Sequence, residues 1–186
     1  MNPTLNKSDF EDLTTSLRDL AYSYLEKYNP SKQQLKIFLL KKYLTKIKGN
    51  KTKKEVTVII DEIILSLEKN KIISDELYSD SKARMFLKRG YSLNKINQSL
   101  RSKGIDSEYI KRSIDKIKDN HIEPDFVSAL KLCKRRRIGP LRPQANRELF
   151  YKKDIGILAR SGFDFETSKK VMDLDQEDYK RIINLL

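Results

Sequence analysis

A cluster of arginines surrounds the expected turn at Gly139-Pro140 and could bind phosphate groups. Arg135, Arg136 and Arg137 precede this turn, and Arg142 follows it. A guanidinium group stays charged and can donate two parallel hydrogen bonds to phosphate or carboxylate oxygens. An ordinary loop rarely needs so many arginines. We therefore interpret the cluster as a contact site for phosphate or for an acidic partner, with a merely solvated loop as the simpler alternative.

The basic residues of the whole chain are unevenly spread. The 186 residues include 39 Lys and Arg against 26 Asp and Glu, a formal net charge of +13. Residues 27–54 hold ten lysines and no carboxylate, and residues 131–153 hold nine basic residues with Glu148 as the single acidic one. Residues 154–186 instead hold five basic and seven acidic residues. Two blocks of one sign favour a polyanionic partner, and nucleic acid is a commoner one than a membrane surface.

Other cations lie at expected helix ends or away from the apolar helix faces. There they can stabilise a helix terminus or contact a partner. We name these candidate polyanion-binding residues: Lys88, Arg89, Lys95, Arg101, Lys103, Lys111, Arg112, Lys134, Arg135, Arg136, Arg137, Arg142, Arg147, Lys152, Lys153 and Arg160. The lysines of residues 46–54 form a separate group, which we expect in a loop.

Signs of catalysis are lacking in the sequence. Cys133 and His121 are the only residues of their kinds, so an internal disulfide is excluded and an all-protein zinc site is not expected. No glycine-rich phosphate loop and no nucleophile with a plausible base is present. We therefore expect no enzyme activity, no metal and no cofactor. Cys133 is expected to be a small buried residue.

The helices that position these cations are clearest in residues 88–117. Gly90 and Gly104 each follow basic residues, as is typical of a helix that ends in a left-handed residue. Ser92 and Asp106 come two residues later and are typical N-caps. Apolar residues then recur every three or four positions, which predicts short amphipathic helices that must pack on one another.

The rest of the chain continues this pattern. We expect helix starts at Ser8 or Asp9, Ser31, Thr52, Ser74 or Asp75, Phe126, Asn146, Asp164 and Asp175. Asn29-Pro30 and Gly162 are expected breaks between helices. Tyr91, Phe163 and Phe165 could stack on bases, but their places after glycine stops favour packing in the core. No convincing strand is found, so the fold class is all-α.

An internal repeat suggests three units. Residues 89–100 (RGYSLNKINQSL) and 161–172 (SGFDFETSKKVM) share a glycine, an aromatic residue and a Ser or Asp cap, while residues 27–39 match more loosely. We expect an array of three tandem three-helix (helix-turn-helix-like) units. The expected bounds are 1–72, 73–121 and 122–186, the last with an extra leading helix.

The segments ISDELYSDSKARMFLK and RGYSLNKINQSLRSKGID, followed by KRRRIGPLRP and LARSGFDFETSKKVM, resemble the RecX family of regulators of the bacterial recombinase RecA. The resemblance runs from about Leu17 to the C-terminus and is strongest over residues 73–117. The chain departs from the family in its first unit, which lacks the glycine and has an extended lysine loop.

The resemblance implies an all-α, elongated and curved molecule. It also implies a non-catalytic cytoplasmic protein of DNA repair and homologous recombination. Such a protein binds the RecA filament on single-stranded DNA, limits its growth or promotes its disassembly, and restrains strand exchange, ATP hydrolysis and the co-protease activity of the SOS response. The candidate residues would then contact the filament or its DNA without base specificity. We expect a monomer.

A helix-turn-helix transcription regulator is the main alternative. In that reading residues 92–103 form a recognition helix, and Lys95, Asn97, Gln98 and Arg101 reach base edges. A membrane-surface protein is a weaker alternative, because the apolar faces are needed between helices. No apolar run is long enough for a membrane span, and the first 19 residues do not have the pattern of a secretory signal.

Overall fold

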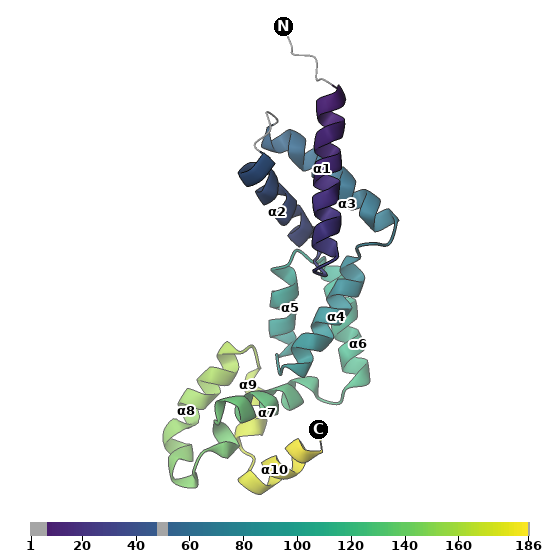
Figure 1. Cartoon of the computed structure of the whole chain (residues 1–186). Helices are drawn as coiled ribbons and strands as arrows, with labels where there is room; N and C mark the ends of the chain where they lie inside the picture. Colours follow the sequence, from purple (N-terminus) through teal and green to yellow (C-terminus); the bar gives the residue numbers. More distant parts are fainter. Residues whose placement is uncertain (1–6, 48–51, 186) are drawn as a thin grey trace. The chain divides into compact units, whose positions relative to one another are not determined.

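The structure is a computed structural model that describes residues 7–47 and 52–185. Within these ranges the chain forms ten α-helices and no strand, which confirms the all-α prediction (Figure 1). The lysine loop predicted at 46–54 lies mostly outside the residues whose side chains are described. Lys53 and Lys54 are described, and both are exposed in the first turn of a helix.

The chain divides into two compact units. The first unit comprises residues 1–78 together with 103–105, and the second comprises 79–102 and 106–186. The division into three units at 72 and 121, and the predicted curvature, stay predictions.

Three helices build most of the first unit. They are α1 (Lys7–Leu25), α2 (Lys32–Lys42) and α3 (Lys53–Lys69), and a π-helical turn (Tyr43–Ile47) extends α2. Ser31 and Thr52 form the predicted N-caps. Each accepts a hydrogen bond from the backbone N–H three residues later, and the Gln or Glu at that position bonds back to the cap.

The core of the first unit is almost entirely aliphatic. The apolar face of α3 is buried over its whole length, and the ring of Tyr24 stacks on that of Phe38 with centroids 4.0 Å apart. The buried residues are Leu13, Leu17, Ala21, Leu35, Leu39, Tyr43, Val56, Ile59, Ile60, Ile63, Ile64, Leu67 and Ile73.

The second unit begins within α4 and runs to α10. Its helices are α4 (Asp75–Lys88), α5 (Leu93–Arg101), α6 (Ser107–Asn120), α7 (Pro124–Arg136), α8 (Gln144–Arg160), α9 (Phe165–Met172) and α10 (Gln176–Asn184). A 3-10 turn (Gly139–Leu141) lies between α7 and α8. Ser92, Asp106, Asp164 and Asp175 are N-caps, as predicted.

A second hydrophobic core holds α7 to α10 together. The Tyr179 hydroxyl donates a hydrogen bond of 3.0 Å to the Leu130 carbonyl, and burial raises the pKa of this phenol to about 12. Cys133 is fully buried as predicted, and burial raises the pKa of its thiol to about 12. The buried residues are Ala129, Leu130, Leu132, Cys133, Ile138, Leu158, Phe163, Val171, Met172 and Tyr179.

Three local predictions were wrong. The helix expected from Asn146 begins at Gln144, because Pro143 itself occupies the N-cap position without a side-chain hydrogen bond. The helix expected from Phe126 begins at Pro124, since proline is well suited to a first helical position. Phe165, expected in the core, is 69% exposed. It is the first residue of α9, and the buried residues of that helix come later in it, at Ser168, Val171 and Met172.

One arrangement of contacts occurs twice. In the first junction, the Ser31 hydroxyl donates to the Lys103 carbonyl at 2.6 Å, and the Asp75 carboxylate accepts the Lys32 N–H at 2.8 Å. In the second junction, the Ser92 hydroxyl donates to the Ser161 carbonyl at 2.8 Å, and the Asp125 carboxylate accepts the Leu93 N–H at 2.7 Å. In both, a serine N-cap joins the start of one helix to the turn before another.

A left-handed glycine follows each accepting carbonyl. Gly104 has a φ of +75° and lies against Gln33, while Gly162 has a φ of +88° and lies against Ser92. By its contacts, Gly162 is therefore the counterpart of Gly104. The internal repeat in the sequence, residues 89–100 and 161–172, instead aligns Gly162 with Gly90.

Candidate polyanion-binding surface

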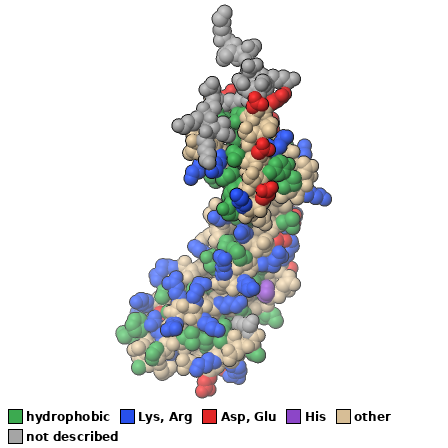
Figure 2. Space-filling model, viewed as in Figure 1, with side chains coloured by type: hydrophobic (Ala, Val, Ile, Leu, Met, Phe, Trp, Pro, Cys, Tyr) green, Lys and Arg blue, Asp and Glu red, His purple; other side chains and the backbone are tan. Residues whose placement is uncertain are grey.

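Positive charge is concentrated in the second unit. This unit contains 24 Lys and Arg against 15 Asp and Glu, whereas the first unit contains 15 against 11. Figure 2 shows many Lys and Arg side chains on the visible face of the second unit. The charge of the first unit is closer to balance because it carries fewer cations, and two of its carboxylates pair with lysines of α2: Glu68 with Lys32 and Asp61 with Lys36.

The end of α4 and the outer face of α7 bring five cations together. The Arg135 guanidinium donates a hydrogen bond of 2.9 Å to the Arg89 carbonyl, and a Cβ built on Gly90 would lie 3.0 Å from the Lys131 Cβ. Residues three and four apart on a helix share a face, so Lys134 and Arg135 lie beside Lys131. We call this set the α4–α7 patch: Lys88, Arg89, Lys131, Lys134 and Arg135.

Most of the α4–α7 patch is open to solvent. Lys131 is half-buried, and the other four residues are exposed. Lys131 was missing from the candidate residues, although its spacing of four from Arg135 was visible in the sequence. The contact that joins the two helices could not be predicted, because its partners are 46 residues apart.

Arg136 and Arg137 extend the exposed cations at the end of α7. Arg137 occupies the left-handed position after the helix, with a φ of +53°. This conformation costs a non-glycine residue about 1–2 kcal/mol, which glycine would avoid. The buried Ile138, whose N–H bonds to the Cys133 carbonyl, holds the turn in place.

Arg142 has a partner inside the protein. Its Nε and Nη2 donate hydrogen bonds of 2.6 and 2.8 Å to the two carboxylate oxygens of Asp154, which is fully buried. The guanidinium also lies over the Phe150 ring, 4.3 Å from its centroid. Burial opposes the charge of Asp154, but the hydrogen bonds from Arg142 and from the Gly139 N–H outweigh it and hold the pKa below its usual range. The hydrogen bonds between Arg142 and Asp154 also raise the pKa of Arg142. Arg142 therefore fixes the turn between α7 and α8, whereas the sequence had suggested that it contacts a polyanionic partner.

Arg147 is also used within the fold. Its Nη2 donates to the Met172 carbonyl at 2.9 Å and to the Leu174 carbonyl at 2.5 Å. These carbonyls lie at the end of α9, where a cation is favoured by the helix dipole. We therefore leave Arg142 and Arg147 out of the proposed binding surface.

The remaining candidate residues are dispersed over both units. Arg112 pairs with Glu108 one turn away on α6, and the Lys153 ammonium lies 5.6 Å from the centroid of the Phe150 ring. Lys103 is half-buried, in the turn that the first junction holds. The others are exposed: Lys95, Arg101, Lys111, Lys152 and Arg160.

The start of α5 lies against the turn between α8 and α9. A Cβ built on Gly162 would lie 3.3 Å from the Lys95 backbone nitrogen and 3.4 Å from the Asn94 Cβ. The side chains that the helix-turn-helix alternative assigns to base readout stay open to solvent: Lys95, Gln98 and Arg101 are exposed, and Asn97 is half-buried. The helix-turn-helix alternative therefore stays a prediction.

Metal and membrane features were also sought among the described residues. No group of three or more His, Cys, Asp or Glu side chains in these residues is arranged to hold a metal ion. None of the described helices is both long enough and apolar enough to cross a membrane.

Comparison with known proteins decides the family. No family model matches the chain. The regulatory protein RecX of Myxococcus xanthus (strain DK1622) is 33% identical over 162 residues, which cover 86% of this chain and 85% of that protein. The chain belongs to the RecX family.

Solved RecX structures show the same fold. RecX from Lactobacillus salivarius is 16% identical and superposes with a TM-score of 0.59, covering 95% of this chain and 99% of that one. A second crystal structure of regulatory protein RecX is 20% identical with a TM-score of 0.63, covering 91% of this chain and 79% of that one. The family resemblance drawn from the sequence is thus confirmed, together with the all-α fold of RecX proteins.

Proposed function

We propose that this protein regulates the recombinase RecA by binding the filament that RecA forms on single-stranded DNA. Membership of the RecX family is the observation that carries the proposal. Binding would limit filament growth or promote disassembly. It would thereby restrain strand exchange, ATP hydrolysis and the co-protease activity of the SOS response.

The α4–α7 patch supports the DNA part of this proposal. Its cations would replace counterions along the phosphate backbone, which gives an affinity that depends steeply on salt and little on base sequence. The patch has no acidic member, and Arg136 and Arg137 continue it along the chain. Such a surface suits a sugar–phosphate backbone better than the base edges of a specific duplex site.

ATP hydrolysis provides the main test of the proposed function. We expect substoichiometric amounts of the protein to slow DNA-dependent ATP hydrolysis by the RecA of the same organism, because one regulator bound to a filament affects many subunits. The measurement is steady-state ATP turnover on a long single strand, with filament length followed by electron microscopy. Unchanged turnover and filament length at excess protein would overturn the proposal.

The patch and its extension at Arg136 can be tested by a triple variant, Lys88→Ala, Lys134→Ala and Arg136→Ala. These residues are exposed, and the structure gives none of them a side-chain partner among the described residues. We expect binding to a deoxythymidine oligonucleotide to weaken and the slope of log K against log salt to fall by about 2, since each phosphate contact on a single strand contributes about 0.7.

A charge-matched control separates this effect from net charge. The triple variant Lys69→Ala, Lys169→Ala and Lys180→Ala removes three exposed lysines far from the patch in sequence. It should leave the salt slope nearly unchanged. If both triple variants lower the slope equally, the protein binds DNA through its overall charge and the patch has no special role.

A further inference from the structure

A cavity of about 190 Å³ lies between α4 and α6 of the second unit, outside all the candidate binding residues. Ile117 is the one lining residue with an apolar side chain, and the aliphatic parts of the other side chains add further apolar surface. The polar lining residues are Asp80, Arg84, Ser113, Lys116, Asn120 and His121.

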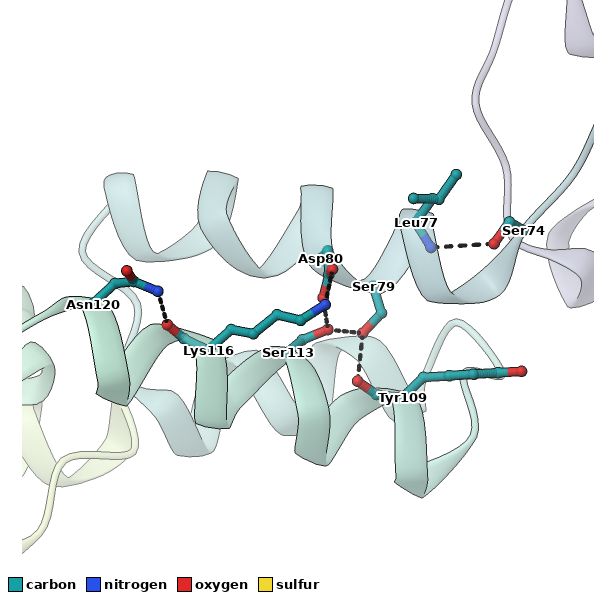
Figure 3. A network of polar contacts seen from close by, with 8 residues as sticks. All are labelled: Ser74, Leu77, Ser79, Asp80, Tyr109, Ser113, Lys116 and Asn120. Atoms are coloured by element: carbon teal, nitrogen blue, oxygen red, sulfur yellow. Dashed lines mark hydrogen bonds and ion pairs between the residues drawn. The ribbon is translucent and has the colours of Figure 1, made fainter.

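A network of hydrogen bonds fixes one wall of this cavity (Figure 3). The Asp80 carboxylate accepts hydrogen bonds of 2.6 Å from the Ser113 hydroxyl and 2.6 Å from the Lys116 ammonium. The Ser113 hydroxyl is itself buried and lies 2.8 Å from that of Ser79. Burial raises the pKa of Asp80, but the bonds from Lys116 and Ser113 outweigh this effect and hold it below the ordinary value. Asp80 therefore stays charged and holds the Lys116 ammonium at the cavity.

Lys116 and Arg84 leave the cavity with excess positive charge. An ammonium has three donors, and Asp80 takes one of those of Lys116. Arg84 is exposed, one helical turn beyond Asp80, and the structure gives it no ion pair or hydrogen bond with another described residue. His121, where α6 ends, adds ring nitrogens that can donate.

In two other cavities of the second unit, the lining carboxylates outnumber the lining cations. One of about 340 Å³ is lined by Lys118 against Asp125 and Asp164. A neighbouring cavity of about 240 Å³ has Lys118 and Lys170 against three carboxylates, those of Glu123, Asp125 and Glu166. Of these three cavities, the one between α4 and α6 is therefore the one whose fixed charges favour an anion.

The cavity is continuous with the α4–α7 patch along α4. Arg84 and Lys88 are four residues apart, so they share a helix face with Cβ atoms about 5–6 Å apart. Lys88 belongs to the patch, and Arg89 joins it to α7. A strand that lies on the patch can thus reach Arg84 without leaving α4.

We propose that the α4–α6 cavity binds a backbone phosphate of single-stranded DNA. Arg84 and Lys116 provide the charge, and His121 and Asn120 provide further donors. This inference rests on the proposed DNA contact, and it extends that contact from an open surface to a defined phosphate site.

The single histidine makes the site directly observable. His121 is the only histidine of the chain, so its ring protons give a separate NMR signal. We expect this signal to shift at fixed pH when a deoxythymidine oligonucleotide is added. A methylphosphonate oligonucleotide of the same length, whose backbone is neutral, should cause a smaller shift. Inorganic phosphate should compete at higher concentration. A shift of equal size with poly-glutamate would overturn the assignment to phosphate.

Arg84→Ala is the decisive variant. It should remove most of the His121 shift and weaken oligonucleotide binding about two- to five-fold, the range of one exposed ion pair. Arg84→Lys should restore part of both effects. Lys180→Ala, which removes an exposed charge on α10, should change neither. An unaltered His121 shift in Arg84→Ala would overturn the inference.

Asp80→Asn separates binding from folding. The amide loses the ion pair with Lys116, so stability should fall, but its oxygen can still accept a hydrogen bond that keeps Lys116 at the cavity. Removal of the negative charge should therefore strengthen oligonucleotide binding. Weaker binding by a folded Asp80→Asn protein would contradict the site. ATP hydrolysis by RecA is a separate readout: if the wild-type protein inhibits it but shows no His121 shift with DNA, the phosphate site is wrong and the proposed function stands.

Discussion

The first and second junctions use the same contacts in different surroundings. In both, a serine N-cap donates to a carbonyl about 70 residues away and a carboxylate accepts the next N–H. In the first junction, the Gln33 side chain covers Gly104, and Lys32 also pairs with Glu68. In the second, the Ser92 hydroxyl itself lies against Gly162, and a cavity of about 340 Å³ adjoins Asp125.

This difference teaches that one set of hydrogen bonds can be retained while the packing around it varies. The two carboxylates have a common property, because burial raises the pKa of both Asp75 and Asp125. Their neighbours differ: Lys32 and Glu68 act on Asp75, and Asp164 and Lys118 act on Asp125. We infer that the serine, the carboxylate and the glycine form the essential part of each junction.

Substitution of the glycines should have the largest effect. A Cβ at Gly104 would lie 2.5 Å from the Gln33 Cβ, and a Cβ at Gly162 would lie 2.6 Å from the Ser92 Oγ. The left-handed backbone costs alanine about 1–2 kcal/mol and overpacking about 1–3 kcal/mol, so each Gly→Ala variant should lose about 2–5 kcal/mol of unfolding free energy in urea denaturation. Gly162→Ala should be the more severe, because it also displaces the Ser92 cap.

Second-site changes sharpen this prediction. Ser92→Ala removes the atom that the new Cβ would meet, so the double variant with Gly162→Ala should lose less than the sum of the single changes. Gln33→Ala removes the Cγ, which lies 2.7 Å from the new Cβ, but keeps the Cβ at 2.5 Å, so it should give Gly104→Ala only partial relief. Additive losses at the second junction would show that Gly162 is needed for its backbone conformation alone.

The serine caps should have an intermediate effect. Ser31→Ala and Ser92→Ala each remove an N-cap, worth about 1 kcal/mol, and a hydrogen bond to a carbonyl, worth about 0.5–1.5 kcal/mol. We expect each to lose about 1.5–2.5 kcal/mol in urea denaturation, with faster amide exchange at Gln34 or Lys95, whose N–H groups bond to the caps. Ser102→Ala, which removes only a local bond to Ser99, is the control. If only one junction responds, the two are not equivalent.

The junction carboxylates should have the smallest effect, seen in the dependence on pH. Burial raises the pKa of Asp75 and Asp125, so the folded state holds their protons more tightly than the unfolded chain. Their contribution to the unfolding free energy therefore falls as the pH rises above the ordinary value of 3.8. Asp80 and Asp154 act in the opposite direction, because their pKa values are lowered and the stability they contribute is lost in acid.

Asn variants isolate this effect. An amide oxygen at residue 75 or 125 can still accept the helix N–H but carries no charge. The unfolding free energy of Asp75→Asn or Asp125→Asn, relative to wild type, should therefore increase with pH over the acidic range. A relative stability that stays constant with pH would mean that the carboxylate titrates alike in the folded and unfolded chain.

Much of the local structure could be predicted because its determinants are close in sequence. A cap such as Thr52 bonds to residues three positions away, so its signal lies within one short segment. The apolar residues of α3 recur every three or four positions, and the six that form this face are all buried: Val56, Ile59, Ile60, Ile63, Ile64 and Leu67. Where the local signals competed, as for Pro143 against Asn146, the helix began earlier than predicted.

The fate of individual cations could not be predicted in the same way. Arg135 and Arg142 belong to one arginine cluster in the sequence, yet Arg142 pairs with a buried carboxylate while Arg135 lies on an exposed patch. A charged side chain looks the same in sequence whether its partner is a phosphate or an aspartate of the next helix. Nothing in the sequence indicated that Arg147 bonds to the end of α9.

The sequence by itself thus determined the helices, most of their caps, the basic character of the protein and its family. Only the tertiary structure decided which serine meets which carbonyl, which glycine corresponds to which, and which cations remain open to a partner. The physical reason is the distance in sequence between the residues that interact. Caps and apolar faces arise from neighbours within one or two helical turns, whereas the junctions, the Arg142–Asp154 pair and the α4–α6 cavity join residues that only packing brings together.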